Sequence, residues 1–210
     1  MRALNVFRDW TRAGGQLGFY TKQTKDRIPP VDGCYAWFFP LWIYREDLEQ
    51  QLDVLDRVFR YDPAPERQVD AAFNWESVRL RLRRHAHVCV TPAKVRTWNG
   101  LLADRKDRVM LERTLLEASL LMPPLYVGKT SNLQRRYLQH VEGAGKLNHF
   151  HRRFDECVRA SGLALTVSDL LFVCIRTAPD EKTSGTTQSA IDELIEQILM
   201  QACRPPFSLK

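Results

Sequence analysis

The sequence contains few cysteines and no long apolar run, and both absences narrow the class of protein. Its five cysteines are scattered and form no C-x-x-C pair, which disfavours a disulfide framework or a zinc knuckle and favours a reduced compartment. No segment approaches the ~20 consecutive apolar residues that a membrane-spanning helix needs. Residues 1–16 also lack the unbroken apolar core of a secretion signal. We therefore expect a cytoplasmic protein with no membrane partner.

Common metal and phosphate motifs are missing as well. The pairs His85-x-His87 and His149-x-His151 have no third ligand at zinc-like spacing, and no glycine-rich stretch has a Walker pattern. The formal net charge is +6, which is compatible with a polyanion such as nucleic acid. A chain of 210 residues fits one domain, or one domain with a large insertion.

Four regions follow from the hydrophobic pattern. We expect an N-terminal helix and arm over residues 1–30, a first core strand over residues 31–43, a mostly helical insertion over residues 44–121, and the rest of the core over residues 122–210. Within the insertion, helical spacing predicts helices over 46–61, 71–84 and 105–121, with breaks at 62–65, Pro92 and Asn99-Gly100.

The last region has the sharpest pattern. It predicts a strand over 125–127, a helix capped by Ser131 or Asn132 that runs to Val141, a helix over 147–160, a strand over 169–176 and a final helix over 188–202.

The helix that ends near Val141 carries two neighbouring stripes. Leu133, Tyr137 and Val141 recur every four residues and are expected to face the core. Arg136 and His140 form the adjacent stripe at the same spacing, so both could reach a common ligand.

The final helix combines an apolar face with a carboxylate. Glu196 is expected at the border of that face, where it could hold a hard cation over a cleft. The apolar residues assigned to the face are Ile191, Leu194, Ile195, Ile198, Leu199 and Ala202.

Two tyrosine-containing triplets frame the insertion, Gly33-Cys34-Tyr35 and Tyr126-Val127-Gly128. The second triplet is followed by Lys129-Thr130, then by the arginine and histidine of the helix, and much later by the glutamate and Pro205. In this order the chain resembles the GIY-YIG nuclease superfamily, and most of all its stand-alone restriction endonucleases. It departs from the family pattern in its large insertion and in Ser208, which stands where the family often has asparagine.

The resemblance implies an α+β fold, with a small three-stranded antiparallel sheet flanked by helices and the insertion between the first two core strands. It also implies the chemistry of a phosphodiesterase. Glu196 would bind Mg²⁺ or Mn²⁺, Arg136 would neutralise charge on the phosphate, and Tyr35 and Tyr126 would orient or activate water. His140 would take a proton, and Lys129 would add a contact to the DNA backbone.

Each of these residues, taken alone, is more typical of an ordinary core or surface position. Tyr35 and Tyr126 fit buried strands, whereas Arg136, His140 and Glu196 fit helix surfaces or boundaries. Their joint order, spacing and helix phase favour the nuclease interpretation.

The insertion is the expected DNA-recognition region. It supplies a basic run, Arg79, Arg81, Arg83 and Arg84, which could bind DNA phosphates or could simply be a solvated face. It also supplies polar and aromatic residues that could contact or stack on bases: Asn74, Trp75, Trp98 and Asn99.

We therefore expect an endonuclease acting on double-stranded DNA, of the restriction type. A structure-specific repair or recombination nuclease and a catalytically impaired nucleic-acid-binding module are the alternatives. Cutting both strands is compatible with a homodimer.

Overall fold

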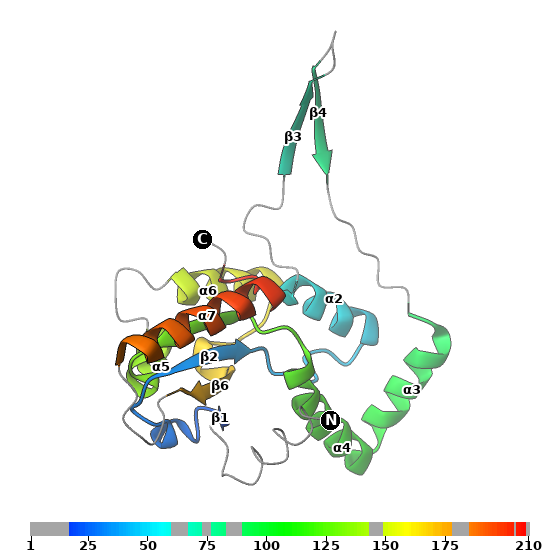
Figure 1. Cartoon of the computed structure of the whole chain (residues 1–210). Helices are drawn as coiled ribbons and strands as arrows, with labels where there is room; N and C mark the ends of the chain where they lie inside the picture. The colour runs from blue at the N-terminus through cyan, green and yellow to red at the C-terminus, as the bar shows by residue number, and fades with distance from the viewer. Residues whose placement is uncertain are drawn as a thin grey trace, which may run out of the picture.

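The computed structural model describes residues 17–59, 67–72, 77–82, 90–142, 149–177, 185–203 and 205–208, and for residues 67–72 and 77–82 it describes the backbone. Over these ranges the chain has an α+β fold (Figure 1). The main sheet is antiparallel with the strand order β1-β6-β2-β5, and a separate hairpin is formed by β3 and β4. The strands are β1 (Leu17–Tyr20), β2 (Gly33–Phe38), β3 (Arg67–Ala72), β4 (Ser77–Leu82), β5 (Tyr126–Thr130) and β6 (Leu171–Arg176).

Helices surround this sheet. The α-helices of the described residues are α2 (Leu48–Phe59), α3 (Pro92–Ala103), α4 (Arg105–Ala118), α5 (Leu133–Val141), α6 (His149–Ser161) and α7 (Gly185–Cys203). Helix α5 contacts β2 and α6, and α7 contacts β5 and β2. Figure 1 shows α5, α6 and α7 grouped around the main sheet, while α3 and α4 form a separate pair at the other end of the molecule. No helix in the described ranges combines the length and apolarity needed to cross a bilayer.

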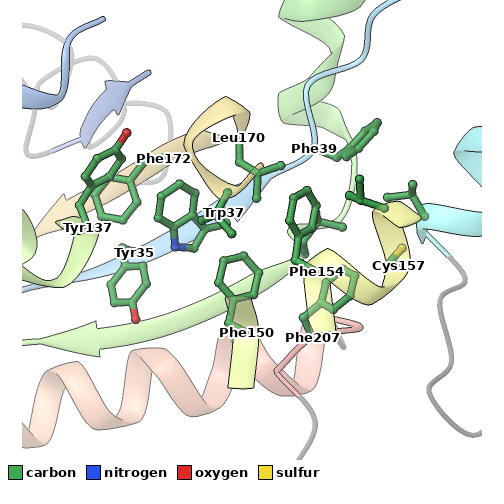
Figure 2. Packing of buried hydrophobic residues seen from close by; sticks show 14 of the residues in the cluster. Tyr35, Trp37, Phe39, Tyr137, Phe150, Phe154, Cys157, Leu170, Phe172 and Phe207 are labelled. Atoms are coloured by element: carbon green, nitrogen blue, oxygen red, sulfur yellow. The ribbon is translucent and has the colours of Figure 1, made fainter. Parts of the chain in front are cut away.

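The core lies against one face of β2. Alternate residues of the strand, Tyr35 and Trp37, are buried on this face. The ring of Trp37 lies 5.3 Å from that of Tyr137, 5.9 Å from that of Phe150 and 4.9 Å from that of Phe172, measured between centroids. Figure 2 shows these aromatic side chains gathered between the sheet and the helices. Burial of such large aromatic side chains dominates the stability of the fold.

The expected antiparallel α+β architecture is confirmed, but the sheet has four strands where three were expected. The additional strand is β1, from the region predicted to be an N-terminal helix and arm; residues 1–16 of that region lie outside the described residues. Strand β1 pairs along its whole length with β6, and the ring of Tyr20 packs against Phe172. A strand of four residues is too short to have a readable period, so its identity comes from pairing rather than from local sequence.

The insertion is partly helical, as expected, but the predicted helix over 71–84 is wrong. This segment contributes to the hairpin of β3 and β4, in which Asp70 lies opposite Arg79 and Gln68 lies opposite Arg81. Polar and apolar residues alternate from Ser77 to Leu82, which is a strand period and was the signal to follow. Figure 1 shows the hairpin projecting away from the main sheet and its helices.

Trp98 ties α3 to the segment just before α2, within the insertion. This tryptophan is buried, and its indole Nε1–H donates to the carbonyl of Glu46 at 2.6 Å. The interpretation of Trp98 as a base-stacking residue is therefore wrong. The expected break at Asn99-Gly100 is also wrong, because both residues lie within α3. Pro92, in contrast, does lie at a helix boundary, since Thr91 caps α3 and Pro92 begins it. Asn74 and Trp75 lie outside the described residues.

Two glycines provide a matched test of this packing. A Cβ at Gly33 would overlap the carbonyl oxygen of Ile175 and lie 3.0 Å from Leu133 Cδ1, whereas a Cβ at Gly100 meets nothing within 4 Å. We expect Gly33→Ala to lower the free energy of unfolding by about 1–3 kcal/mol, as overpacking does. Gly100→Ala should raise it by about 0.5–1 kcal/mol, because alanine is the better helix former. Urea denaturation of both variants measures the difference, and equal effects would contradict the close approach of β2 to β6.

Candidate active site

Strand β2 places Tyr35 at the centre of the site. Tyr35 lies opposite Gly128 of β5 on one side and Cys174 of β6 on the other. A Cβ added at Gly128 would lie 2.6 Å from the hydroxyl oxygen of Tyr35. A glycine at this position therefore leaves the space that the phenol occupies, which explains why a tyrosine in the first triplet requires a glycine in the second.

Helix α5 brings two more of the expected residues to the same place. Asn132 caps the helix by accepting a hydrogen bond from the backbone N–H of Arg135 at 2.8 Å. The predicted core stripe is confirmed for Leu133 and Tyr137, which are fully buried. The neighbouring stripe, Arg136 and His140, then lies along β2.

Arg136, Tyr35 and His140 form one continuous hydrogen-bonded chain. The Nε–H of Arg136 donates to the Tyr35 hydroxyl oxygen at 3.0 Å, and that oxygen lies 2.9 Å from His140 Nε2. A guanidinium can only donate, so the phenol accepts from Arg136 and its own hydrogen is available to His140. When the tautomer of His140 is assigned from these hydrogen bonds, Nε2 accepts from the Tyr35 hydroxyl and the other ring nitrogen, Nδ1, carries the proton.

Tyr126 completes the cluster from β5. Its ring is stacked on Tyr35 with centroids 6.0 Å apart, and it meets His140 edge to face at 5.3 Å. The structure therefore brings together the two tyrosines, the arginine and the histidine that the sequence singled out. Tyr35 and His140 are buried, each only 2% exposed, whereas Tyr126 and Arg136 are partly exposed.

Burial controls the ionisation of this cluster. It raises the pKa of Tyr35 well above its ordinary value, and the nearby Tyr126 hydroxyl adds to the increase, while Arg136 opposes it. Burial alone would lower the pKa of Arg136, but Tyr35 and Tyr126 raise it above its ordinary value. The resting site therefore holds a neutral phenol beside a permanent cation.

Glu196 lies on α7, whose helix phase differs from the expected one. Leu194 and Ile198, which were assigned to the core face, are 62% and 56% exposed. Among the α7 side chains whose burial is described (residues 190 and 193–203), the partly buried ones are Ile195, Glu196, Leu199, Met200 and Cys203. The helix is thus rotated by roughly a quarter turn from the predicted phase, and Glu196 lies within its inward stripe rather than at the border.

Contacts with two strands place the helix that carries Glu196. Helix α7 contacts β5 and β2, the strands that carry Tyr126 and Tyr35. In Figure 2 the Tyr35 hydroxyl points towards the side on which α7 passes. One turn before Glu196, the carboxylate of Glu193 lies 3.6 Å from Lys129 Nζ on β5. Lys129 pairs opposite Cys34, so strand alternation puts its position on the other face of β5 from Tyr126 and Gly128, and it already has an acidic neighbour.

The predicted phosphate-binding arginines are in a different region. Arg79 and Arg81 are alternate residues of β4, so their positions share one face of the hairpin. Arg83 and Arg84 lie outside the described residues. The structure therefore places Arg79 and Arg81 on the projecting hairpin, away from the tyrosine cluster.

Sequence reasoning missed Gln139. Its side-chain oxygen accepts a hydrogen bond from Arg136 Nη1 at 3.2 Å, which helps to orient the guanidinium. The spacing of three residues along one helix was the available signal.

Ser208 has a clear structural role. Its hydroxyl accepts a hydrogen bond from the Val127 backbone N–H at 3.0 Å, and the adjacent Phe207 N–H donates to the Leu125 carbonyl at 3.0 Å. Phe207 is buried against Phe150 and Phe154. These C-terminal residues therefore bind the outer edge of β5, and they fix the end of α7 relative to Tyr126.

A hard divalent cation fits the donors that are present. Among the described side chains, no group of three or more histidine, cysteine, aspartate or glutamate residues could enclose a metal. Mg²⁺ does not need such a group, since it commonly keeps several waters and takes one or two carboxylates. Glu196, on the inward stripe of α7, is the carboxylate that suits this role.

Substitution of Tyr35 tests the buried phenol. The pKa of Tyr35 is raised in the folded state. The phenol therefore contributes its full stabilisation when the pH is below the unfolded-state pKa of about 10, and this contribution is lost as the pH rises above that value. At pH 8, Tyr35→Phe should lower the free energy of unfolding by about 1 kcal/mol through lost hydrogen bonds. The difference between wild type and variant should shrink by about pH 11. Denaturation curves at both pH values measure it, and a constant difference would contradict the raised pKa.

Substitution of Ser208 tests the C-terminal contact. Ser208→Ala leaves the Val127 N–H without its acceptor and should lower the free energy of unfolding by about 1–2 kcal/mol. Ser208→Asn keeps an acceptor for that N–H and should retain most of the stability. Hydrogen exchange at the Val127 amide gives the local readout, and an amide equally protected in wild type and Ser208→Ala would refute the assigned bond.

Comparison with known proteins supplies no family assignment. No protein-family model matches this chain, and neither a curated protein nor a solved structure matches it. The functional conclusion therefore depends on the geometry of the tyrosine cluster and of α7.

Proposed function

We propose that this chain is a metal-dependent endonuclease that hydrolyses phosphodiester bonds in DNA, built on a GIY-YIG type of core. The observation that carries the proposal is the chain from the Arg136 guanidinium through the Tyr35 hydroxyl to His140 Nε2, with bond lengths of 3.0 and 2.9 Å. It combines a fixed cation, a proton donor and a base in one cluster, which are groups that phosphodiester cleavage requires.

The tyrosines and the histidine supply a route for a proton. A water molecule that attacks the phosphorus must lose a proton as the new P–O bond forms and the bond to the leaving 3′ oxygen breaks. Tyr35 accepts this proton on its oxygen while its own hydrogen passes to His140 Nε2. The raised pKa of Tyr35 fits this relay, because the phenol then returns to its neutral form rather than remaining an anion. Tyr126, stacked on Tyr35, orients the water.

Arg136 supplies positive charge on the same side. Its Nε–H is held by Tyr35 and one Nη1–H by Gln139, so the guanidinium is oriented before any ligand binds. A guanidinium has five N–H donors in a planar fork that matches a phosphate. Pre-oriented donors of this kind stabilise the charge that develops in the transition state.

Glu196 would hold the metal. A bound Mg²⁺ or Mn²⁺ supplies Lewis-acid charge to the phosphate and to the leaving oxygen. The half-buried carboxylate lies on a helix that contacts both tyrosine-bearing strands, which suits a ligand shared with a substrate phosphate. Lys129 would contact the DNA backbone beside it.

The insertion supports a sequence-specific, restriction-type activity on double-stranded DNA. A two-stranded ribbon fits the major groove, and β3 and β4 form such a ribbon, projecting from the catalytic core (Figure 1). Arg79 and Arg81 lie on one face of it. The bond between Ser208 and Val127 weakens one of the two reasons for regarding the chain as an impaired binding module, because serine supplies an acceptor at the position where asparagine was expected. The unusual insertion is the other reason.

Substitution of Glu196 tests the proposal. In Mg²⁺, wild-type protein should cut plasmid DNA into discrete fragments, and Glu196→Gln should lower the rate by at least about 10³-fold while DNA binding is retained. Glu193→Gln is the matched control, since this carboxylate lies one turn away and is 74% exposed. It should change the rate by less than about tenfold.

The outcomes separate the candidate functions. An unchanged rate in Glu196→Gln would eliminate the metal-binding role, and binding without cleavage in Mg²⁺ and Mn²⁺ would leave only the binding module. Preference for a flap or branched substrate over plain duplex would favour a structure-specific repair or recombination nuclease.

A further inference from the structure

Helix α4 and the short 3₁₀ turn after it, η2 (Ser119–Leu121), expose an unusual number of large apolar side chains. The exposed fractions are 58% for Val109, 60% for Met110, 37% for Leu116, 39% for Leu120 and 86% for Leu121. Single exposed apolar residues are normal, but several on one helix mark an interaction surface. We call these five residues the α4 stripe.

The spacing aligns three members of the α4 stripe, whereas Met110 and Leu121 lie about 100–120° further round the helix. Val109, Leu116 and Leu120 are separated by seven and four residues, which at ~100° per residue keeps them within about 40° of one another around the helix. This is the seam spacing of helices that pack against another helix. The inner side of α4 is already in use, since α4 contacts α3 and Leu115 packs on the core. The stripe is therefore a second face with no partner among the described residues.

The charges on the exposed face are complementary to themselves. Arg113 and Glu117 lie beside the stripe with side chains 81% and 66% exposed. In an antiparallel pair of α4 helices related by a two-fold axis near residue 115, residue 113 of one copy faces residue 117 of the other. Arg113 and Glu117 then form two symmetric ion pairs, and Val109 meets the Leu120–Leu121 end of the second helix. An isologous two-fold contact requires this kind of self-complementarity.

We propose that α4 docks antiparallel against α4 of a second copy of this chain, with the α4 stripe as the apolar contact and Arg113 and Glu117 pairing across the two-fold axis. The contact itself does not depend on the proposed nuclease chemistry. If that chemistry holds, the dimer provides one active site for each DNA strand. A single helix pair is smaller than a standard interface of about 800 Å² per partner, so we expect a dissociation constant on the order of micromolar.

Sedimentation of the full chain between about 1 and 100 μM, a range that brackets this affinity, tests the proposal first. The wild type should pass from monomer to dimer across this range. Leu116→Glu should remain monomeric, because it places two carboxylates close together near the axis. Leu194→Glu is the control, since Leu194 is an apolar residue on α7 that is 62% exposed, against 37% for Leu116, and it should dimerise like the wild type.

A charge exchange makes the test specific to this geometry. Arg113→Glu and Glu117→Arg should each weaken the dimer by at least tenfold, because each creates two like-charge pairs across the axis. An equimolar mixture of the two variants should recover the wild-type dimer, since every cross-axis pair in the mixed dimer is again opposite in charge. The ion pair between residues 113 and 117 within one helix is broken in both variants and stays broken in the mixture. Recovery of the dimer therefore cannot come from that intrahelical pair.

Several outcomes would overturn the proposal. A chain that remains monomeric at 100 μM, a dimer that survives Leu116→Glu, or a mixture that fails to recover would each do so. Loss of the dimer in Leu194→Glu alone would move the interface to α7. A dimer that appears only after deletion of residues 1–16 would assign the α4 stripe to that segment instead of a second copy.

Discussion

Strand β2 is hydrogen-bonded along both of its edges, and this double pairing determines the position of every group in the candidate site. It sets Tyr35 opposite Gly128 and Cys174 and turns the phenol towards α5. A register shift of one residue would replace Tyr35 with Cys34 on that face and remove the hydrogen bonds to Arg136 and His140. The aromatic packing around Trp37 opposes such a shift, because it would have to be broken at the same time. The hydrophobic core therefore holds the polar cluster in register.

Two different kinds of contact hold the two sides of the site. On the α5 side the contacts are buried and directional: a guanidinium, a phenol and an imidazole within hydrogen-bonding distance. On the α7 side the helix is held at its C-terminal end by residues 205–208 on the edge of β5, and near its middle by an exposed pair between Glu193 and Lys129. Exposed pairs contribute little. The tyrosine cluster is thus preorganised by directional bonds, whereas the helix that carries Glu196 is held by its inward stripe against β5 and β2 together with this C-terminal attachment.

The sequence was most informative where local pattern and tertiary structure agree. The cap at Asn132, the core stripe of α5 and the adjacent stripe of Arg136 and His140 follow from helical periodicity alone, and all are present. Strand β1 could not be predicted because four residues give no period, and pairing with β6 decides its conformation. The phase of α7 was wrong because this helix carries more apolar residues than one buried face can hold, so composition did not show which ones face inward. From Ser77 to Leu82 the alternation of polar and apolar residues indicated a strand, but the arginines of this segment were interpreted as part of a helix.

The insertion between β2 and β5 also has a consequence for biosynthesis. The central strand of the sheet is made early, but both of its neighbours are made late, with the α2–α4 region and the hairpin between them. Contacts that are distant in sequence form slowly because a long loop must close first. On the ribosome, the aromatic segment around Trp37 must wait for β5 and β6 to emerge before it can be covered. The nascent chain is therefore most vulnerable to aggregation during this interval, and nuclease chemistry of the proposed kind could begin only after α7, which carries Glu196, has emerged.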